Sequence, residues 1–279
     1  MKWDNAERRA IFDKLVALSE TAPTGETEAR RDRVAGNGGS LHSDLNARGN
    51  VAHWRGLAKR AGAAHRSGSG GTVGGRGEPR YYNSIFTIDE RGEIVDTADK
   101  VHLVPFGEYL PYEHLLRGLG LQEVVEMPGG FTAGASRRAL KVKDGRTFLP
   151  LICYEAIFPD ELGYTGEKAG AIINVTNDGW YGDTPGPYQH FRQAQVRAVE
   201  QGLPLIRAAN NGLSGVIDAY GRITAGLALD DVGVIDASLP SPRAPFWGIP
   251  PGRWQTVAVL LTLLVMSMAF RLSNGRRFH

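Results

Sequence analysis

The chain has little cysteine and little net charge, and both shortages narrow its possible functions. Its 279 residues contain one cysteine, Cys153, which excludes an internal disulfide framework and a structural zinc site built on cysteine. The formal net charge of +2 gives no general reason to expect a nucleic-acid partner. No apolar run typical of a secretory leader follows Met1, so we expect no signal peptide.

The segment 24–80 is poor in large aliphatic side chains and rich in glycine. Its 57 residues include six Leu, Ile, Val or Phe and 13 of the chain's 36 glycines, with five more positive than negative charges. That aliphatic share lies below the roughly 20% under which chains tend to be disordered. We therefore expect an atypical, disordered segment at 24–80, between a first helix within 1–23 and a folded domain at 81–245.

Beyond this segment the sequence has the pattern of a layered α/β domain. Short apolar runs typical of buried strands recur at 148–152, 171–175, 204–208, 214–218 and 232–236. Residues 188–200 have a helical pattern, and turn residues at 89–92 and 219–222 predict two hairpins. The alternation of buried strands with a helix predicts an α/β fold.

The longest uncharged apolar run lies near the C-terminus, at residues 254–270. Arg253 precedes these 17 residues, and three arginines lie in the tail 271–279. Seventeen residues is the short limit for a membrane span, and a buried core helix is rarely apolar on every face. We therefore expect a transmembrane helix at 254–270 and a basic cytoplasmic tail at 271–279.

Three residues could carry chemistry. Cys153 ends the run 148–152, where α/β folds place reactive groups, although a buried and inert thiol is the plain interpretation. Lys100 is either a surface lysine or, if it lies near Cys153, a cation that lowers the thiol pKa and stabilises an oxyanion. His190 suggests a Cys-His dyad, but a histidine satisfied by local hydrogen bonds at a helix start is the favoured interpretation.

Four motifs occur in order along the chain: Lys100–Tyr109, Cys153–Glu155, Asn177–Gly182 and Asn210–Gly212. Together with the apolar C-terminal run, they resemble the nitrilase superfamily, and within it the bacterial apolipoprotein N-acyltransferases. The resemblance covers residues 1–23 and 78–279. It implies an αββα sandwich, here incomplete, with one C-terminal membrane helix, on the periplasmic face of the bacterial inner membrane. We expect neither a cofactor nor a metal.

The resemblance also implies a reaction. An acyl chain would move from a phospholipid to the N-terminal S-diacylglyceryl-cysteine of a lipoprotein, through a thioester on Cys153. Lys100 would stabilise the oxyanion with the backbone N–H that follows Cys153, and Glu108 would support Lys100. Three residues would shape the acyl and lipoprotein pocket: Tyr154, Glu155 and Trp180.

The sequence departs from that family at the general base. The family's base glutamate follows an apolar strand in a Trp-Pro-Glu type motif, and 24–80 contains no such motif. The acids of the segment are Glu26, Glu28, Asp32, Asp44 and Glu78. We interpret residues 24–77 as an out-of-frame stretch, with a true insertion as the alternative, and expect an N-terminally truncated and impaired enzyme.

Two other functions remain open. A nitrilase-type amidase that hydrolyses a small C–N bond would use the same triad, and only the apolar C-terminal run favours acyl transfer over it. The chain could also be a non-catalytic remnant, in which 24–80 binds nucleic acid or anionic lipid. Trp54 is the single aromatic residue of that segment, which disfavours the binding module.

Overall fold

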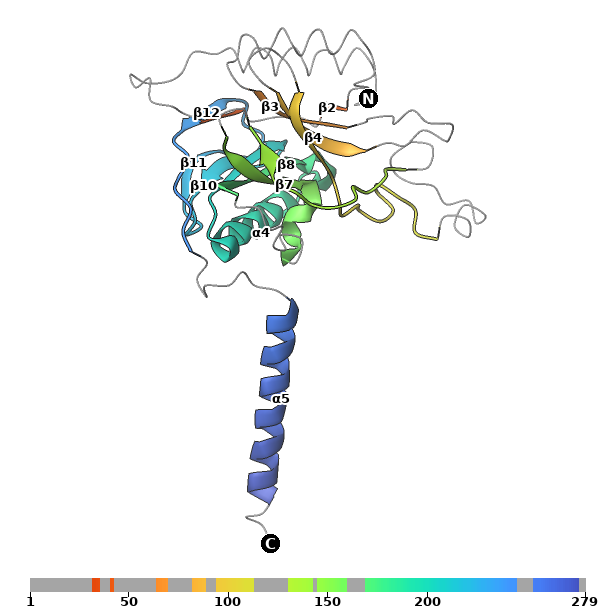
Figure 1. Cartoon of the computed structure of the whole chain (residues 1–279), viewed down its shortest axis with the longest axis vertical. Helices are drawn as coiled ribbons and strands as arrows, with labels where there is room; N and C mark the ends of the chain where they lie inside the picture. Colours follow the sequence, from red (N-terminus) through yellow and green to blue (C-terminus); the bar gives the residue numbers. More distant parts are fainter. Residues whose placement is uncertain are drawn as a thin grey trace.

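The computed structural model describes an α/β domain and a C-terminal helix (Figure 1). The described residues are 32–35, 41–42, 64–69, 82–88, 94–112, 130–142, 145–159, 169–244 and 253–275. The helix expected within 1–23 lies outside them.

Six strands form the larger sheet, in the order β11-β10-β9-β8-β7-β6. At its centre, β7 (Thr147–Ile152), β8 (Ala171–Asn177) and β9 (Leu205–Asn210) run parallel. The antiparallel neighbours are β6 (Leu140–Lys141), β10 (Ser214–Ile217) and β11 (Ile223–Leu227). Four of these strands, β7, β8, β9 and β10, confirm the apolar runs at 148–152, 171–175, 204–208 and 214–218.

A smaller sheet of four strands has the order β2-β3-β4-β5. Its strands are β2 (Leu41–His42), β3 (Ala64–Ser69), β4 (Asn83–Ile88) and β5 (Ile94–Asp99), and β4 and β5 form the expected hairpin. A separate pair joins β1 (Asp32–Ala35) to β12 (Val234–Ala237).

Three of these strands lie in the segment for which the sequence predicts disorder. β3 pairs with β4 over its whole length, from Ala64 opposite Ile88 to Ser69 opposite Asn83. β1, β2 and β3 therefore differ from the expectation at those residues, because strand pairing uses backbone donors and acceptors that every non-proline residue carries. The rest of 24–80 lies outside the described residues, and the domain boundaries stay predictions.

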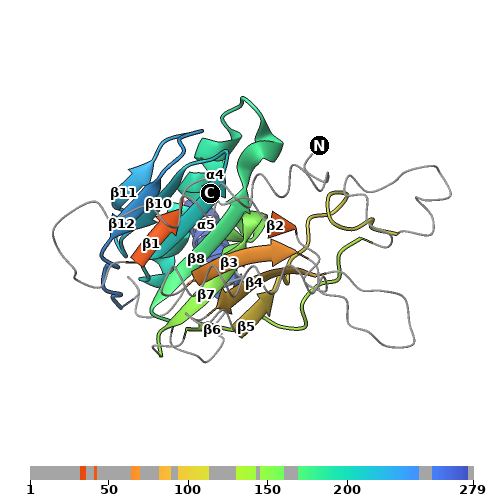
Figure 2. The same ribbon diagram turned by 90° about the horizontal axis from the view of Figure 1, so that it is seen from above.

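The two sheets pack face to face. Ile85 on β4 and Ala98 on β5 belong to one buried cluster with Phe148, Ile152 and Ile173 of the larger sheet. In Figure 2, β4 lies against β7 and β5 lies against β6. Because the parallel strands are covered on both faces, their side chains are apolar almost without alternation.

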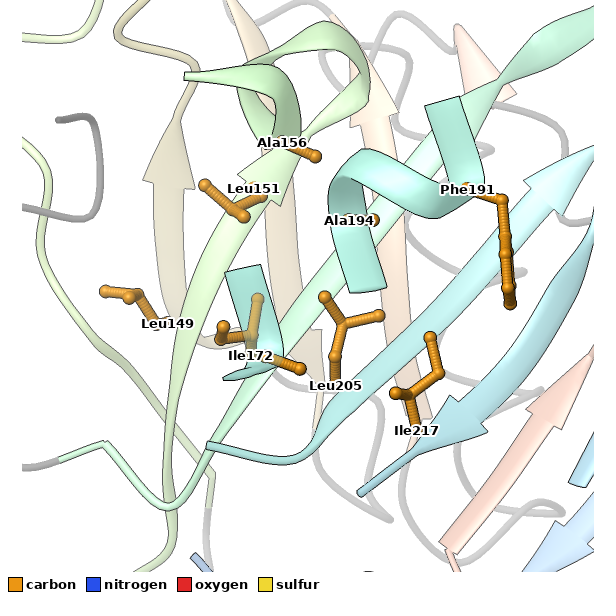
Figure 3. Close-up of a cluster of buried hydrophobic side chains, with 9 residues drawn as sticks. Leu149, Leu151, Ala156, Ile172, Phe191, Ala194, Leu205 and Ile217 are labelled. Carbon is orange, nitrogen blue, oxygen red and sulfur yellow. The ribbon is translucent and has the colours of Figure 1, made fainter. Parts of the chain in front are cut away.

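The other face of the larger sheet is covered by α4 (Gly186–Gln201). Leu149, Leu151 and Leu205 of the sheet pack against Phe191 and Ala194 of the helix (Figure 3). Six residues of α4 are buried, at helical spacing: Pro187, His190, Phe191, Ala194, Arg197 and Ala198. The layered α/β fold and the helix expected at 188–200 are thereby confirmed.

The C-terminal helix α5 (Arg253–Gly275) extends away from the α/β domain (Figure 1). Residues 257–271 of this helix are all exposed, including leucines such as Leu260 and Leu264, which are 60% and 56% exposed. None of the helices in the described part of the chain combines the length and the hydropathy that a membrane crossing requires. The transmembrane helix expected at 254–270 is therefore a helix but is not confirmed as a membrane span.

Candidate active site at the carboxyl end of the parallel strands

Cys153 lies where β7 ends and the short helix η1 (Cys153–Ile157) begins. Its backbone φ is 53°, in the left-handed region. A non-glycine residue there carries about 1–2 kcal/mol of strain, so the surrounding structure must hold it in place. The thiol is free and partly exposed, as a nucleophile at a strand end requires.

Lys100 follows β5 directly and is buried. Its Nζ lies 2.7 Å from Oε2 of Glu108. The same Glu108 oxygen accepts a hydrogen bond from the backbone N–H of Val104 at 2.9 Å, and Oε1 accepts one from Nδ2 of Asn83 at 3.1 Å. Burying an ammonium is costly unless it is paired, and the ion pair with Glu108 both offsets that cost and fixes the direction of the Lys100 side chain. The supporting role expected for Glu108 in catalysis stays a prediction.

Glu155 links the Lys100 loop to the strand that carries Cys153. Its Oε1 accepts hydrogen bonds from the backbone N–H groups of Val101 at 2.9 Å and His102 at 3.0 Å. Its Oε2 accepts one from the backbone N–H of Ile152 at 2.7 Å. One carboxylate therefore binds the residue after Lys100 and the residue before Cys153, which brings the two predicted catalytic residues into one site.

The carboxylate of Glu155 is occupied by protein donors. It is 1% exposed and forms an ion pair with Nη2 of Arg137 at 2.7 Å. This arrangement favours a positioning role for Glu155 in place of the expected contact with substrate.

A buried polar cluster formed by Asp178, His190 and Arg207 lies next to Cys153. Asp178, in the short helix η3 (Asp178–Tyr181), accepts a hydrogen bond from Nη2 of Arg207 at 2.6 Å and lies 2.9 Å from Nδ1 of His190. Nε2 of His190 lies 3.1 Å from the carbonyl oxygen of Cys153. His190 therefore contacts the backbone of the cysteine, and the favoured interpretation of a locally hydrogen-bonded histidine agrees with this geometry.

Charges in the cluster shift the pKa values of its members. Burial raises the pKa of Asp178, but the hydrogen bond from His190 and the charge of Arg207 outweigh burial and hold this pKa below its usual value. Burial also raises the pKa of the Tyr181 phenol, and negative charge on the nearby Cys153 and Asp178 adds to the rise. Asp178 is therefore a carboxylate, and the phenol of Tyr181 is neutral.

The two aromatic residues expected in the substrate pocket are accessible. Tyr154 is 38% exposed and meets Phe158 edge to face, with ring centroids 5.9 Å apart. Trp180, in η3, is 57% exposed. Each follows a strand of the parallel set, so both lie at the same end of the sheet as Cys153. Their contact with substrate stays a prediction.

The general base has no counterpart among these contacts. Of the five acids in 24–80, Asp32 lies in β1, and the structure does not describe its side chain. Glu26, Glu28, Asp44 and Glu78 lie outside the described residues. In the described ranges, no three His, Cys, Asp or Glu side chains come together as metal ligands would.

Comparison with known proteins gives this arrangement a family. A sequence model described as carbon-nitrogen hydrolase matches residues 14–247. The chain belongs to the carbon-nitrogen hydrolase family. Its Lys100, Glu108 and Cys153 thus lie on a hydrolase scaffold of known type.

Two relatives within this family are named apolipoprotein N-acyltransferase. The protein from Brucella melitensis biotype 1 is 68% identical over 281 residues, which cover 100% of this chain and 53% of that protein. The protein from Agrobacterium fabrum is 52% identical over 199 residues, which cover 71% of this chain and 38% of that protein. The chain spans about half the length of the curated relatives that it matches first.

A solved structure shares the carbon-nitrogen hydrolase fold. An amidase from Nesterenkonia sp. superposes with a TM-score of 0.50 at 21% identity, covering 76% of this chain and 72% of that protein. At this identity the likeness concerns the fold alone.

Sequence reasoning missed several residues of this carbon-nitrogen hydrolase site. Asp178 lies inside a recognised motif, but no role was assigned to it. Arg207 lies inside the apolar run 204–208, and a charge within a buried strand was its available signal. Arg137 gave no signal, because the residue it pairs with is 18 positions away.

Proposed function

We propose that this chain carries an acyl group on Cys153 as a thioester and transfers it from a phospholipid to the amine of a diacylglyceryl-lipoprotein. The observation that carries this proposal is the single carboxylate of Glu155, which ties the Lys100–Glu108 ion pair to the backbone before Cys153. A strained cysteine beside a fixed ammonium has the parts that acyl transfer through a thioester needs. The names of the two relatives support the same reaction.

In the first half-reaction, the Cys153 thiolate attacks the ester carbonyl of the phospholipid. A C–S bond forms, the ester C–O bond breaks, and the lysophospholipid leaves as an alcohol after accepting a proton. Nζ of Lys100 and the backbone N–H of Tyr154 stabilise the oxyanion that forms between these steps. Glu108 keeps the ammonium directed at that oxyanion through the 2.7 Å ion pair.

In the second half-reaction, the α-amine of the lipoprotein's diacylglyceryl-cysteine attacks the thioester. The C–N bond forms, the C–S bond breaks, and the amine gives up a proton as the thiolate of Cys153 leaves. No described carboxylate is assigned to accept these protons. We therefore expect turnover about 10²–10⁴-fold below that of an enzyme with a positioned base.

The exposed helix α5 favours a lipid substrate over a small amide. Large apolar side chains that face water on all sides of a helix are typical of a surface that meets lipid or another protein. We propose that α5 holds the catalytic domain at the bacterial inner membrane, with the domain on the periplasmic side. A soluble amidase would have no use for such a helix.

The experiment compares lipid and amide substrates on the same protein. The 279-residue chain is incubated with phosphatidylethanolamine vesicles, and its intact mass is followed for an added acyl group that hydroxylamine removes. We expect the adduct on the natural chain and its absence in Cys153→Ala. If the chain releases ammonia from short amides and forms no adduct with phospholipid, the proposed acyl transfer is wrong and the amidase function is supported.

A further inference from the structure

Two side chains form hydrogen bonds with the carbonyl oxygen of Cys153. Nε2 of His190 lies 3.1 Å from the carbonyl oxygen, and Nδ2 of Asn174 donates a longer bond of 3.4 Å to it. A carbonyl oxygen only accepts hydrogen bonds, so Nε2 of His190 is the donor of the shorter contact. The φ angle of Cys153 is 53°, so its backbone is strained. A hydrogen bond to its carbonyl fixes the orientation of the peptide plane that follows this strained residue.

The imidazole of His190 is itself held in one orientation. The carboxylate of Asp178 faces Nδ1 at 2.9 Å, and both side chains are at most 1% exposed. Oδ1 of Asp178 also accepts a hydrogen bond from Thr176 at 3.0 Å, while Oδ2 binds Arg207. The ring therefore has no freedom to turn its Nε2 away from the Cys153 carbonyl without breaking a buried contact.

The remaining groups around the ring close the site. The rings of Tyr154 and Tyr181 lie 6.0 Å and 5.7 Å from that of His190. Nη2 of Arg207 lies 3.2 Å from Nδ1. The backbone of Gly212 packs so closely on Asp178 that an added Cβ would overlap Oδ2. Gly212 therefore blocks movement of the Asp178 carboxylate on that side.

We propose that His190 is a positioning residue for the nucleophile Cys153. The N–H at Nε2 of His190 donates a hydrogen bond to the carbonyl of Cys153, and Asp178 fixes the imidazole ring at Nδ1. The contact holds the left-handed peptide of Cys153 and thereby directs Sγ toward the oxyanion site of Lys100. The effect on acyl transfer rests on the proposed function, whereas the effect on the thiol does not.

Two amide substitutions separate this role from a purely structural one. The glutamine amide in His190→Gln extends as far as Nε2 and can replace the donor to Cys153. The asparagine amide in His190→Asn extends as far as Nδ1 and can replace the donor to Asp178 but not the one to Cys153. A structural role for the histidine would be rescued by asparagine, and a positioning role by glutamine.

The readout is alkylation of the thiol by iodoacetamide at pH 7, followed by intact mass and divided by the folded fraction from circular dichroism. Cys153 is the only cysteine, so every adduct reports on it. We expect His190→Gln to alkylate within about threefold of the natural chain and His190→Asn to fall by about 10-fold or more. Gln189→Ala changes an exposed neighbour on the same helix and serves as the unchanged control.

Thioester formation from phospholipid is measured on the same variants. Because a misplaced reacting atom costs about 10²-fold in rate, we expect that loss in His190→Asn, with the apparent affinity for phospholipid unchanged. Equal alkylation rates in the two amide variants, or faster alkylation in His190→Asn, would overturn the proposal. If His190→Asn does not fold, His190→Gln decides alone, because a loss of 10-fold or more in its alkylation rate contradicts the proposal.

If the natural chain is alkylated by iodoacetamide but forms no thioester, the proposed acyl transfer is refuted. The positioning role of His190 is then tested by the alkylation rates of the two amide variants alone.

Discussion

Glu155→Gln tests the link between the two halves of the site. The substitution keeps the shape of the side chain but replaces one acceptor oxygen by an NH₂ donor. Each carboxylate oxygen accepts a backbone hydrogen bond, so the new donor must face either Ile152 or the pair Val101 and His102. The substitution also leaves the largely buried guanidinium of Arg137 without its carboxylate.

The expected loss of stability follows from this burial. Removing one partner of a buried ion pair costs about 3–5 kcal/mol, because the other charge stays buried. Asp96→Asn is the matched control, since Asp96 pairs with Arg138 at the same 2.7 Å and also accepts two backbone hydrogen bonds, but the side chain of Arg138 is 47% exposed. For a pair whose cation reaches solvent we expect a loss of at most about 1 kcal/mol.

Urea unfolding of the two variants measures this difference. We expect a lower midpoint with an unchanged slope for Glu155→Gln, and a midpoint close to that of the natural chain for Asp96→Asn. Thioester formation by the folded fraction of Glu155→Gln should fall as well, because the Lys100 loop is no longer tied to the Cys153 strand. Equal stability losses in the two variants would refute the reasoning.

Four further outcomes are expected. Lys100→Ala should abolish the thioester adduct seen by mass spectrometry while leaving iodoacetamide adducts detectable, whereas an unchanged acyl adduct would contradict its role on the oxyanion. The folded-state pKa of Asp178 is lowered, so its contribution to stability is present above the unfolded value of about 3.9 and is lost as the pH falls through the folded pKa. Asp178→Asn should therefore lower the free energy of unfolding at pH 7. In acid titrations followed by circular dichroism, the free energy of unfolding of this variant should fall less steeply with decreasing pH below about pH 4. A fall as steep as that of the natural chain would contradict this expectation. Gly212→Ala should lower the melting temperature, because the new Cβ would overlap the Asp178 carboxylate, and an unchanged melting temperature would show that Asp178 can move. Leu261→Asp should weaken co-sedimentation of the chain with vesicles, since a carboxylate at the centre of a lipid-inserted helix costs about 2.5–3.5 kcal/mol, and unchanged sedimentation would argue against lipid contact by α5.

The parallel strands and α4 were predictable from the sequence because they are buried in a regular way. β8 is covered on both faces, and its residues Ala171–Val175 form an unbroken apolar run apart from Asn174. α4 packs one face only, which spaces its buried residues as a helix does. The spacing of apolar residues in the sequence follows which side chains are buried, so it predicts these strands and this helix.

β3 was not predictable in the same way. Its sequence, Ala64–Ser69, contains histidine, arginine, serine and glycine and no large aliphatic residue. It is a strand because the edge of β4 offers backbone partners along six residues. A partner that is distant in the sequence leaves no local signal.

The sequence by itself determined which residues we expect to carry the chemistry, because the motifs around Lys100, Glu108 and Cys153 contain the candidate reactive groups together with their immediate neighbours. Tertiary structure alone decided what holds those groups. Glu155 contacts residues more than 50 positions away, and His190 contacts the Cys153 carbonyl across 37 positions. Such contacts depend on how strands and loops from distant parts of the chain meet at one end of the sheet, and no periodicity in the sequence encodes that meeting.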